Sequence, residues 1–143
     1  VRVINAGISG ATSASAVSRL KWQLRVPPEI MILALGANDG LRGISVEEMR
    51  KNLDAAIALA LNSGVRVLLA GMKLPPNYGH EYTRDFESTF PELAAKRNVA
   101  LIPFLLEGVA ARTELNQADG IHPTARGYEI VTETILTYLR PLL

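Results

Sequence analysis

The stretch that decides the fold is Ile30-Met31-Ile32-Leu33-Ala34-Leu35-Gly36-Ala37-Asn38-Asp39, in which six apolar residues precede a short polar loop. The apolar run shows no strict alternation with polar residues, which is typical of a strand covered on both faces of a parallel sheet. Three further runs share this character: Val1–Asn5, Val65–Ala70 and Val99–Phe104. We therefore expect four strands.

The segments between these runs are long enough for the crossover helices that parallel strands require. The clearest helix spans Ser45 to Asn62, because Ser45 and Glu48 form a capping box and Gly64 follows its end. Further helices are expected at 13–24, 81–96 and 125–139, the second kinked or divided by Pro91. In the first and last helices the expected inward-facing residues are Val17, Leu20, Leu24, Tyr128, Val131, Ile135 and Leu139. The pattern predicts one α/β domain over residues 1–143, with an open, doubly wound, mainly parallel sheet.

The composition excludes several classes of function. The 143 residues carry 15 Lys and Arg against 14 Asp and Glu, so nothing favours nucleic acid or an anionic membrane surface as a partner. The absence of cysteine rules out thiol catalysis and Cys-ligated zinc, and two histidines cannot form a three-His metal site. No apolar run reaches the roughly 18–20 residues of a membrane span. We expect no metal, no cofactor and no stable membrane insertion.

Two loops that follow strands contain candidate hydrogen-bond donors. In Asn5–Thr12, two glycines allow backbone N–H groups to approach a ligand, although a tight turn that needs glycine explains the same pattern. In the loop after Leu35, the Asn38 amide can donate to a developing oxyanion, or it can bond to its own turn. In open α/β sheets, ligand sites lie beyond the carboxyl ends of the strands, where both loops are expected.

The segment Asp119-Gly120-Ile121-His122-Pro123 contains a candidate general base. The Asp119 carboxylate can fold back onto one ring nitrogen of His122, fix its tautomer and leave the other nitrogen free to take a proton. An incidental loop pair and a metal site are the alternatives, although two ligands make a poor metal site. The other histidine, His80, lies in a turn-rich loop and is interpreted as exposed.

Together these segments resemble the SGNH (GDSL-type) hydrolases, in particular the bacterial acyl-CoA thioesterase I, arylesterase and lysophospholipase branch. The markers are Val3–Ser13, Leu35–Gly43, Leu74–Gly79 and Asp119–Pro123, and the resemblance runs along essentially the whole chain. It implies a flavodoxin-like three-layer α/β/α fold and a metal-free Ser-His-Asp hydrolase acting on small acyl esters or thioesters. The implied roles are His122 as general base, Asp119 as its orienting carboxylate, Gly10 and Asn38 as oxyanion donors, and Gly40, Leu41, Leu74 and Pro75 as acyl-chain contacts.

The nucleophile of this family lies in an N-terminal Gly-Asp-Ser-Leu motif, upstream of the segment with which this chain begins. We therefore expect the nucleophile in a strand and helix that precede Val1, as a missing N-terminal segment of the same protein. Ser9 is the serine near the proposed oxyanion donor, and we do not expect it to substitute. The alternatives are a binding module that has lost its nucleophile and, less well supported, a phosphate-binding domain without a phosphate loop. The resemblance also implies a periplasmic or secreted location.

Overall fold

The computed structural model describes residues 1–143 and contains one sheet of three parallel strands. The strands are β1 (Ile30–Leu33), β2 (Arg66–Ala70) and β3 (Ala100–Ile102), and they lie side by side in that order. Ile30 pairs with Arg66 at the start of β1, and Leu68 pairs with Ala100 at the start of β3. Each connection between neighbouring strands contains a helix, as the sequence predicts for an α/β domain.

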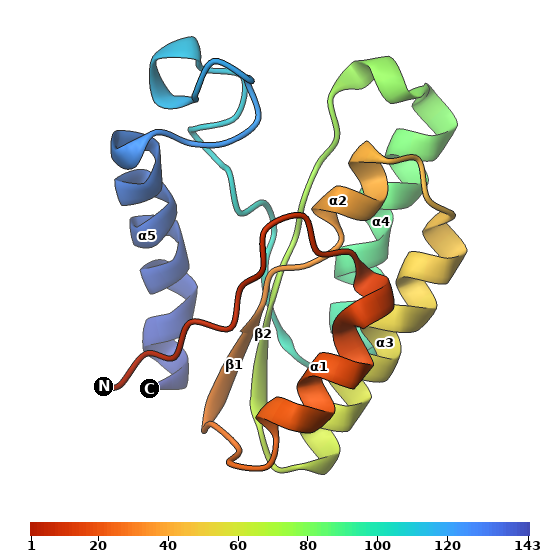
Figure 1. Ribbon diagram of the computed structural model, residues 1–143, viewed down its shortest axis with the longest axis vertical. Helices are drawn as coiled ribbons and strands as arrows, with labels where there is room; N and C mark the ends of the chain where they lie inside the picture. Colours follow the sequence, from red (N-terminus) through yellow and green to blue (C-terminus); the bar gives the residue numbers. More distant parts are fainter.

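The helices form a layer on each side of the sheet (Figure 1). The helices α1 (Ala16–Gln23), α3 (Val46–Asn62) and α4 (His80–Arg97) cover one face, and α5 (Ala125–Leu139) covers the other. A short helix, α2 (Ala37–Leu41), follows β1 directly. Single 3-10 turns occur at Ser13–Ser15, Pro76–Tyr78, Thr113–Leu115 and Arg140–Leu142. None of these helices has the length and apolar content needed to cross a bilayer.

The core is divided unequally between the two faces of the sheet. Successive residues of β2 point to opposite faces, so Val67 and Leu69 join the larger cluster while Leu68 faces α5. The larger cluster contains 15 buried residues, whereas the two clusters on the α5 side contain three each. The packing beneath α5 is therefore the smaller of the two interfaces.

The predicted bounds of two helices, and the predicted cap of the first, are confirmed. The Ser45 hydroxyl accepts a hydrogen bond from the Glu48 N–H at 3.3 Å and starts α3. Gly64 adopts a φ of 78° after the end of this helix, a conformation that favours glycine. The last helix has the predicted range of 125–139, and the Thr124 hydroxyl caps it by accepting from the Gly127 N–H.

The predicted strand Val1–Asn5 is wrong. This segment passes in front of the sheet in Figure 1 without any backbone hydrogen bond to it. Val1 and Val3 are fully or largely exposed. An apolar run becomes a strand only where a neighbouring strand offers paired N–H and C=O groups, and β1 pairs with β2 alone. Ile32 of β1 is 39% exposed, so this strand is not fully covered on both faces either.

Two details expected of the helices are contradicted. Pro91 does not divide α4, which runs unbroken through it because buried residues on both sides, Phe90 and Leu93 among them, hold the helix against the sheet layer. Tyr128 is half-exposed, since the first turn of α5 packs through Gly127 instead. A methyl group at Gly127 would lie 2.4 Å from the Leu115 carbonyl oxygen, so the helix and the preceding loop approach closely there.

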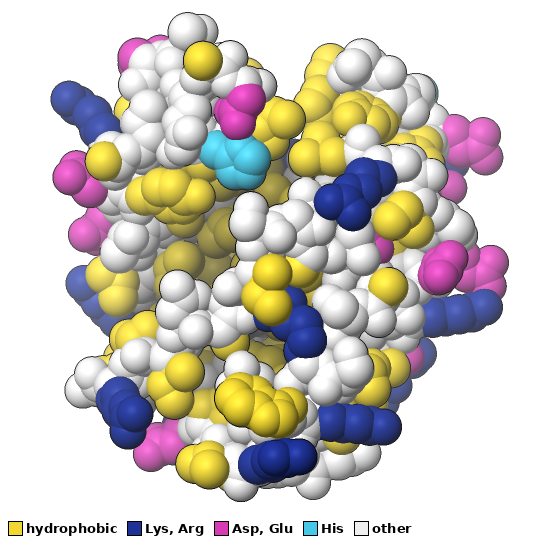
Figure 2. Space-filling model, viewed as in Figure 1, with side chains coloured by type: hydrophobic (Ala, Val, Ile, Leu, Met, Phe, Trp, Pro, Cys, Tyr) yellow, Lys and Arg dark blue, Asp and Glu magenta, His cyan; other side chains and the backbone are white.

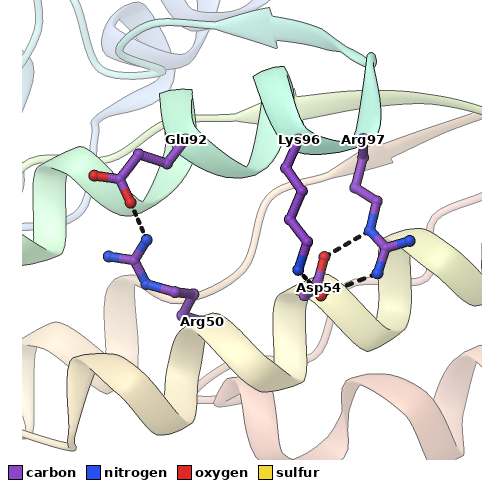
Figure 3. Close-up of polar contacts among 5 residues, drawn as sticks. All are labelled: Arg50, Asp54, Glu92, Lys96 and Arg97. Carbon is purple, nitrogen blue, oxygen red and sulfur yellow. Dashed lines mark hydrogen bonds and ion pairs between the residues drawn. The ribbon is translucent and has the colours of Figure 1, made fainter.

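Ion pairs join α3 to α4 on the outer surface (Figure 3). The Asp54 carboxylate accepts from Arg97 Nε at 2.6 Å and from Lys96 Nζ at 2.7 Å, and Arg50 pairs with Glu92 nearby. The hydrogen bond from Arg97, with a smaller contribution from Lys96, holds the pKa of Asp54 at about 2 against the opposing effect of burial. The Asp54 cluster therefore stabilises the fold only while this carboxylate is ionised.

Replacement of Asp54 by asparagine is expected to lower the free energy of unfolding by about 1–2 kcal/mol at pH 7. The native pKa lies below that of the unfolded chain, so the contribution is complete above pH 5 and declines as the pH falls. Urea unfolding at pH 7 and pH 3 should show the difference shrinking by roughly half. Glu47→Gln, which removes an exposed pair with Lys51, is the matched control and should change stability little. A difference for Asp54→Asn that is independent of pH would contradict this account.

Candidate active site

A single tight turn brings Asp119 and His122 into contact. Asp119 Oδ2 lies 2.6 Å from His122 Nδ1. The other carboxylate oxygen, Oδ1, accepts from the backbone N–H groups of Ile121 and His122 at 2.9 and 3.0 Å. Gly120 makes the turn possible with a φ of 71°. Both carboxylate oxygens are therefore used to hold the imidazole and its backbone.

The electrostatics of this turn define the tautomer of His122. The hydrogen bond from His122, together with those from the two backbone N–H groups, holds the pKa of Asp119 at about 2. Asp119 is therefore a carboxylate at neutral pH and must accept, so Nδ1 carries the proton when the ring is neutral. Nε2 then presents a lone pair and has no hydrogen-bond partner, and the side chain is 62% exposed.

The loop that carries this pair is anchored to the α5 side of the sheet. Asn116 and Pro123 form an antiparallel bridge, and Gln117 donates through its backbone N–H to the His122 carbonyl at 2.7 Å. The buried Asn116 amide donates to the carbonyl oxygens of Val109 and Arg112 at 2.7 and 2.8 Å. The position of His122 therefore depends on the packing of this loop against α5.

The candidate oxyanion donors Gly10 and Asn38 lie in one hydrogen-bonded cluster. Gly10 has a φ of 73°, and its backbone N–H makes no hydrogen bond. Asn38 Nδ2 donates to the Ala11 carbonyl at 3.0 Å, which uses one of its two N–H groups and leaves the second without a partner. Arg42 Nη2 donates to the Gly10 carbonyl at 3.0 Å. Two unused donors thus belong to segments that are tied together.

Three residues of this cluster escaped the sequence analysis. Asp39 is buried and accepts from both the backbone N–H and the hydroxyl of Ser13, at 2.8 and 2.5 Å. Asn52, on α3, donates to the same hydroxyl at 3.1 Å. The available signal was the acid that directly follows Asn38, just after an apolar run, since an acid so close to the core must find hydrogen-bond partners.

The four candidate acyl-chain contacts have different surroundings. Gly40 and Leu74 are buried against each other, since a Cβ at Gly40 would lie 2.6 Å from Leu74 Cδ2. The Leu41 carbonyl accepts from the Tyr78 hydroxyl at 3.0 Å, and Pro75 is exposed. The structure therefore brings the end of α2 against the segment 74–78. In this arrangement Leu41 and Pro75 are more accessible than the other two.

Figure 2 shows that this side of the molecule is hollowed between α5 and the α1 layer, with hydrophobic side chains lining the hollow. The loop between β3 and α5, which carries Asp119, and the segment that follows β2 lie at the end of the sheet to which the strands run (Figure 1). His80 lies elsewhere: it is the first residue of α4, is exposed, and lines a separate groove of about 770 Å³ with Lys73 and Arg84.

The sequence profile of the GDSL-like lipase/acylhydrolase family matches residues 1–130. The chain belongs to this family. Among its GDSL-like relatives is the esterase TesA of Pseudomonas aeruginosa, 42% identical over 99% of this chain and 71% of the relative. Thioesterase 1/protease 1/lysophospholipase L1 of Escherichia coli is 34% identical over 99% of this chain and 68% of its own length.

A solved structure of TesA superposes with a TM-score of 0.95 at 42% identity, covering 99% of this chain and 79% of that one. This agreement confirms the predicted fold class of the GDSL-like family, a mainly parallel sheet between two layers of helices.

Proposed function

We propose that this chain carries the acid–base and oxyanion groups of a serine hydrolase that cleaves carboxylic esters or thioesters, of the arylesterase, acyl thioesterase or lysophospholipase type. The contact of Asp119 Oδ2 with His122 Nδ1 carries the proposal, because it leaves Nε2 free to act as a base. The names of the relatives, an esterase and a thioesterase/lysophospholipase, support the same substrate class.

The proposed reaction is a two-step acyl transfer. A serine hydroxyl attacks the carbonyl carbon while His122 Nε2 takes its proton, and the Asp119 carboxylate stabilises the resulting imidazolium. The Gly10 N–H, the free N–H of Asn38 and the backbone N–H of the serine stabilise the oxyanion. His122 then protonates the leaving alcohol or thiol, and water activated by the same ring hydrolyses the acyl-enzyme. In this scheme Asp119 and His122 are the only side chains that carry charge during the reaction.

We infer that the nucleophilic serine lies outside residues 1–143. None of the seven serines hydrogen-bonds to His122, and the hydroxyls of Ser13, Ser15, Ser18, Ser45, Ser63 and Ser88 are engaged with other partners. Ser9 is exposed and lies in the same turn as the Gly10 N–H. A turn that presents an N–H to the oxyanion is not expected also to present the nucleophile. The unpaired edge of β1 and the hydrophobic hollow between α5 and the opposite helix layer support a further strand of the same protein at this edge.

Labelling with a serine-directed fluorophosphonate tests this proposal. In the protein purified from its source, we expect an intact mass above 15.5 kDa, or a companion peptide, and one labelled serine outside residues 1–143. A label on Ser9 would overturn the placement of the nucleophile. A homogeneous 15.5 kDa protein that neither reacts nor hydrolyses esters would instead favour a binding module that keeps the pocket without a nucleophile.

Replacement of Asn38 by alanine is expected to lower the turnover number of the full-length enzyme by about 10²–10³-fold, since one oxyanion donor is lost. The Michaelis constant should change little, because the donor acts mainly on charge that develops in the transition state. Steady-state kinetics with a 4-nitrophenyl ester would measure both. Asn77→Ala, at an exposed position without hydrogen bonds, is the matched control. Near-normal turnover of Asn38→Ala would remove Asn38 from the oxyanion site.

We also propose a periplasmic or secreted location, which rests on the family resemblance. Fractionation of the source cells, followed by immunoblotting, would test it, and recovery in the cytoplasmic fraction alone would contradict it.

A further inference from the structure

Asp39 is a buried acid for which the proposed reaction has no direct use. It is 1% exposed and forms no ion pair with Lys, Arg or His. A carboxylate removed from water is costly unless hydrogen bonds compensate it, and here both oxygens accept from Ser13. An apolar side chain would fill this position without the free-energy cost of removing a charge from water. The acid therefore indicates that the segments bonded to it must be held in a defined position.

The contacts of Asp39 join segments that are far apart in sequence. Ser13 is 26 residues from Asp39, and Asn52, which donates to the Ser13 hydroxyl, is 39 residues from Ser13. Asp39 follows Asn38 directly on α2, and Ser13 follows the Gly10 turn by three residues. These hydrogen bonds therefore join the two segments that carry the candidate donors, and Asn52 ties both segments to α3.

Two other contacts join the same segments, but they are more exposed. Arg42 reaches the Gly10 carbonyl at the surface, and Asn38 reaches Ala11 in a partly buried position. The Asp39–Ser13 pair is fully buried and charge-assisted, which makes it the strongest of the three links. It is therefore the contact that fixes the distance between the two segments.

We propose that Asp39 is a positioning residue, which acts through Ser13 and Asn52 to hold the Gly10 N–H and the Asn38 amide at the separation that a tetrahedral oxyanion requires. This inference rests on the proposed function. Asp39 does not touch the substrate, because it is only 1% exposed and both carboxylate oxygens bond to Ser13. Oxyanion donors stabilise the transition state only when they are already in place, so a displacement of about 0.5–1 Å removes much of that stabilisation.

The test compares Asp39→Asn and Asn52→Ala in the full-length enzyme, with kcat referred to the concentration of sites that react with a fluorophosphonate. Asparagine keeps the shape of Asp39 but removes the charge and turns an amide N–H₂ toward a Ser13 donor. We expect kcat to fall by about 10–100-fold for Asp39→Asn and several-fold for Asn52→Ala, with KM within about twofold. Asp85→Asn, which changes a half-exposed acid next to Arg84, is the control and should leave both constants unchanged.

A second readout separates positioning from a purely structural role. If Asp39 aligns the donors, Asn38→Ala should cost less than about tenfold in the Asp39→Asn background, compared with about 10²–10³-fold in the parent. A structural role alone would lower the free energy of unfolding and leave kcat per reactive site, and the full Asn38 effect, intact. Should Asp39→Asn fail to fold, Asn52→Ala decides by the same two measurements.

The outcomes distinguish this inference from the proposed function. If Asn38→Ala itself has no effect in the parent, the oxyanion assignment fails and the role of Asp39 falls with it. If Asn38→Ala has its expected effect while Asp39→Asn or, where that variant does not fold, Asn52→Ala leaves kcat unchanged, only the positioning role is overturned.

Discussion

Replacement of His122 by alanine is expected to lower the turnover number of the full-length enzyme by about 10⁵–10⁶-fold, the scale on which serine hydrolases depend on their general base. Without Nε2, no group near the nucleophile accepts its proton or returns it to the leaving group. The same change should abolish the covalent adduct with a fluorophosphonate, because that reaction also requires an activated hydroxyl. Single-turnover kinetics and intact-mass spectrometry would measure the two effects.

His80→Ala is the matched control, since His80 is exposed on α4 and lines a different groove. It should leave turnover and labelling unchanged. An adduct that forms on His122→Ala at the parental rate would show that another group activates the serine.

Replacement of Asp119 by asparagine is expected to lower the turnover number by about 10³–10⁴-fold. The two backbone N–H groups that now bond to Oδ1 will select the amide oxygen at that position, so the amide N–H₂ faces His122 Nδ1. Nδ1 must then accept, the proton moves to Nε2, and Nε2 can no longer take the proton of the serine. The geometry of the turn is preserved while the tautomer is wrong.

The nitrogen-15 chemical shifts of the imidazole would report this exchange of tautomers directly. Glu114→Gln serves as the control, because it removes an exposed charge from the same loop without removing a hydrogen bond. Unchanged shifts together with normal turnover would contradict the orienting role of Asp119.

Features that depend on neighbours in sequence were predictable. The cap at Ser45, the helix over 125–139 and the contact between Asp119 and His122 all involve residues three or four positions apart, or one regular period. The strand expected at Val1–Asn5 failed because pairing depends on a partner strand that local sequence cannot supply.

The same distinction holds within the candidate site. Asn38 was chosen as a candidate donor because it follows an apolar run and a glycine, and its role at the oxyanion stays a prediction. The link from Asp39 through Ser13 to Asn52 was not, because it spans three elements that meet only in the folded chain. The placement of Gly40 and Leu74 beside the acyl chain stays a prediction, whereas their burial against each other follows from packing beneath α2, which sequence spacing does not show.

The unequal division of the core has a consequence for how this protein loses activity on warming. The acid–base turn is anchored on the α5 side, above clusters of three buried residues each, while the donor loops belong to the side with 15. The acid–base turn and the donor loops are each held together by their own hydrogen bonds, but fewer buried side chains support the α5 side. We therefore expect warming to loosen the packing beneath α5 first, which would move His122 away from the donors before either part unfolds.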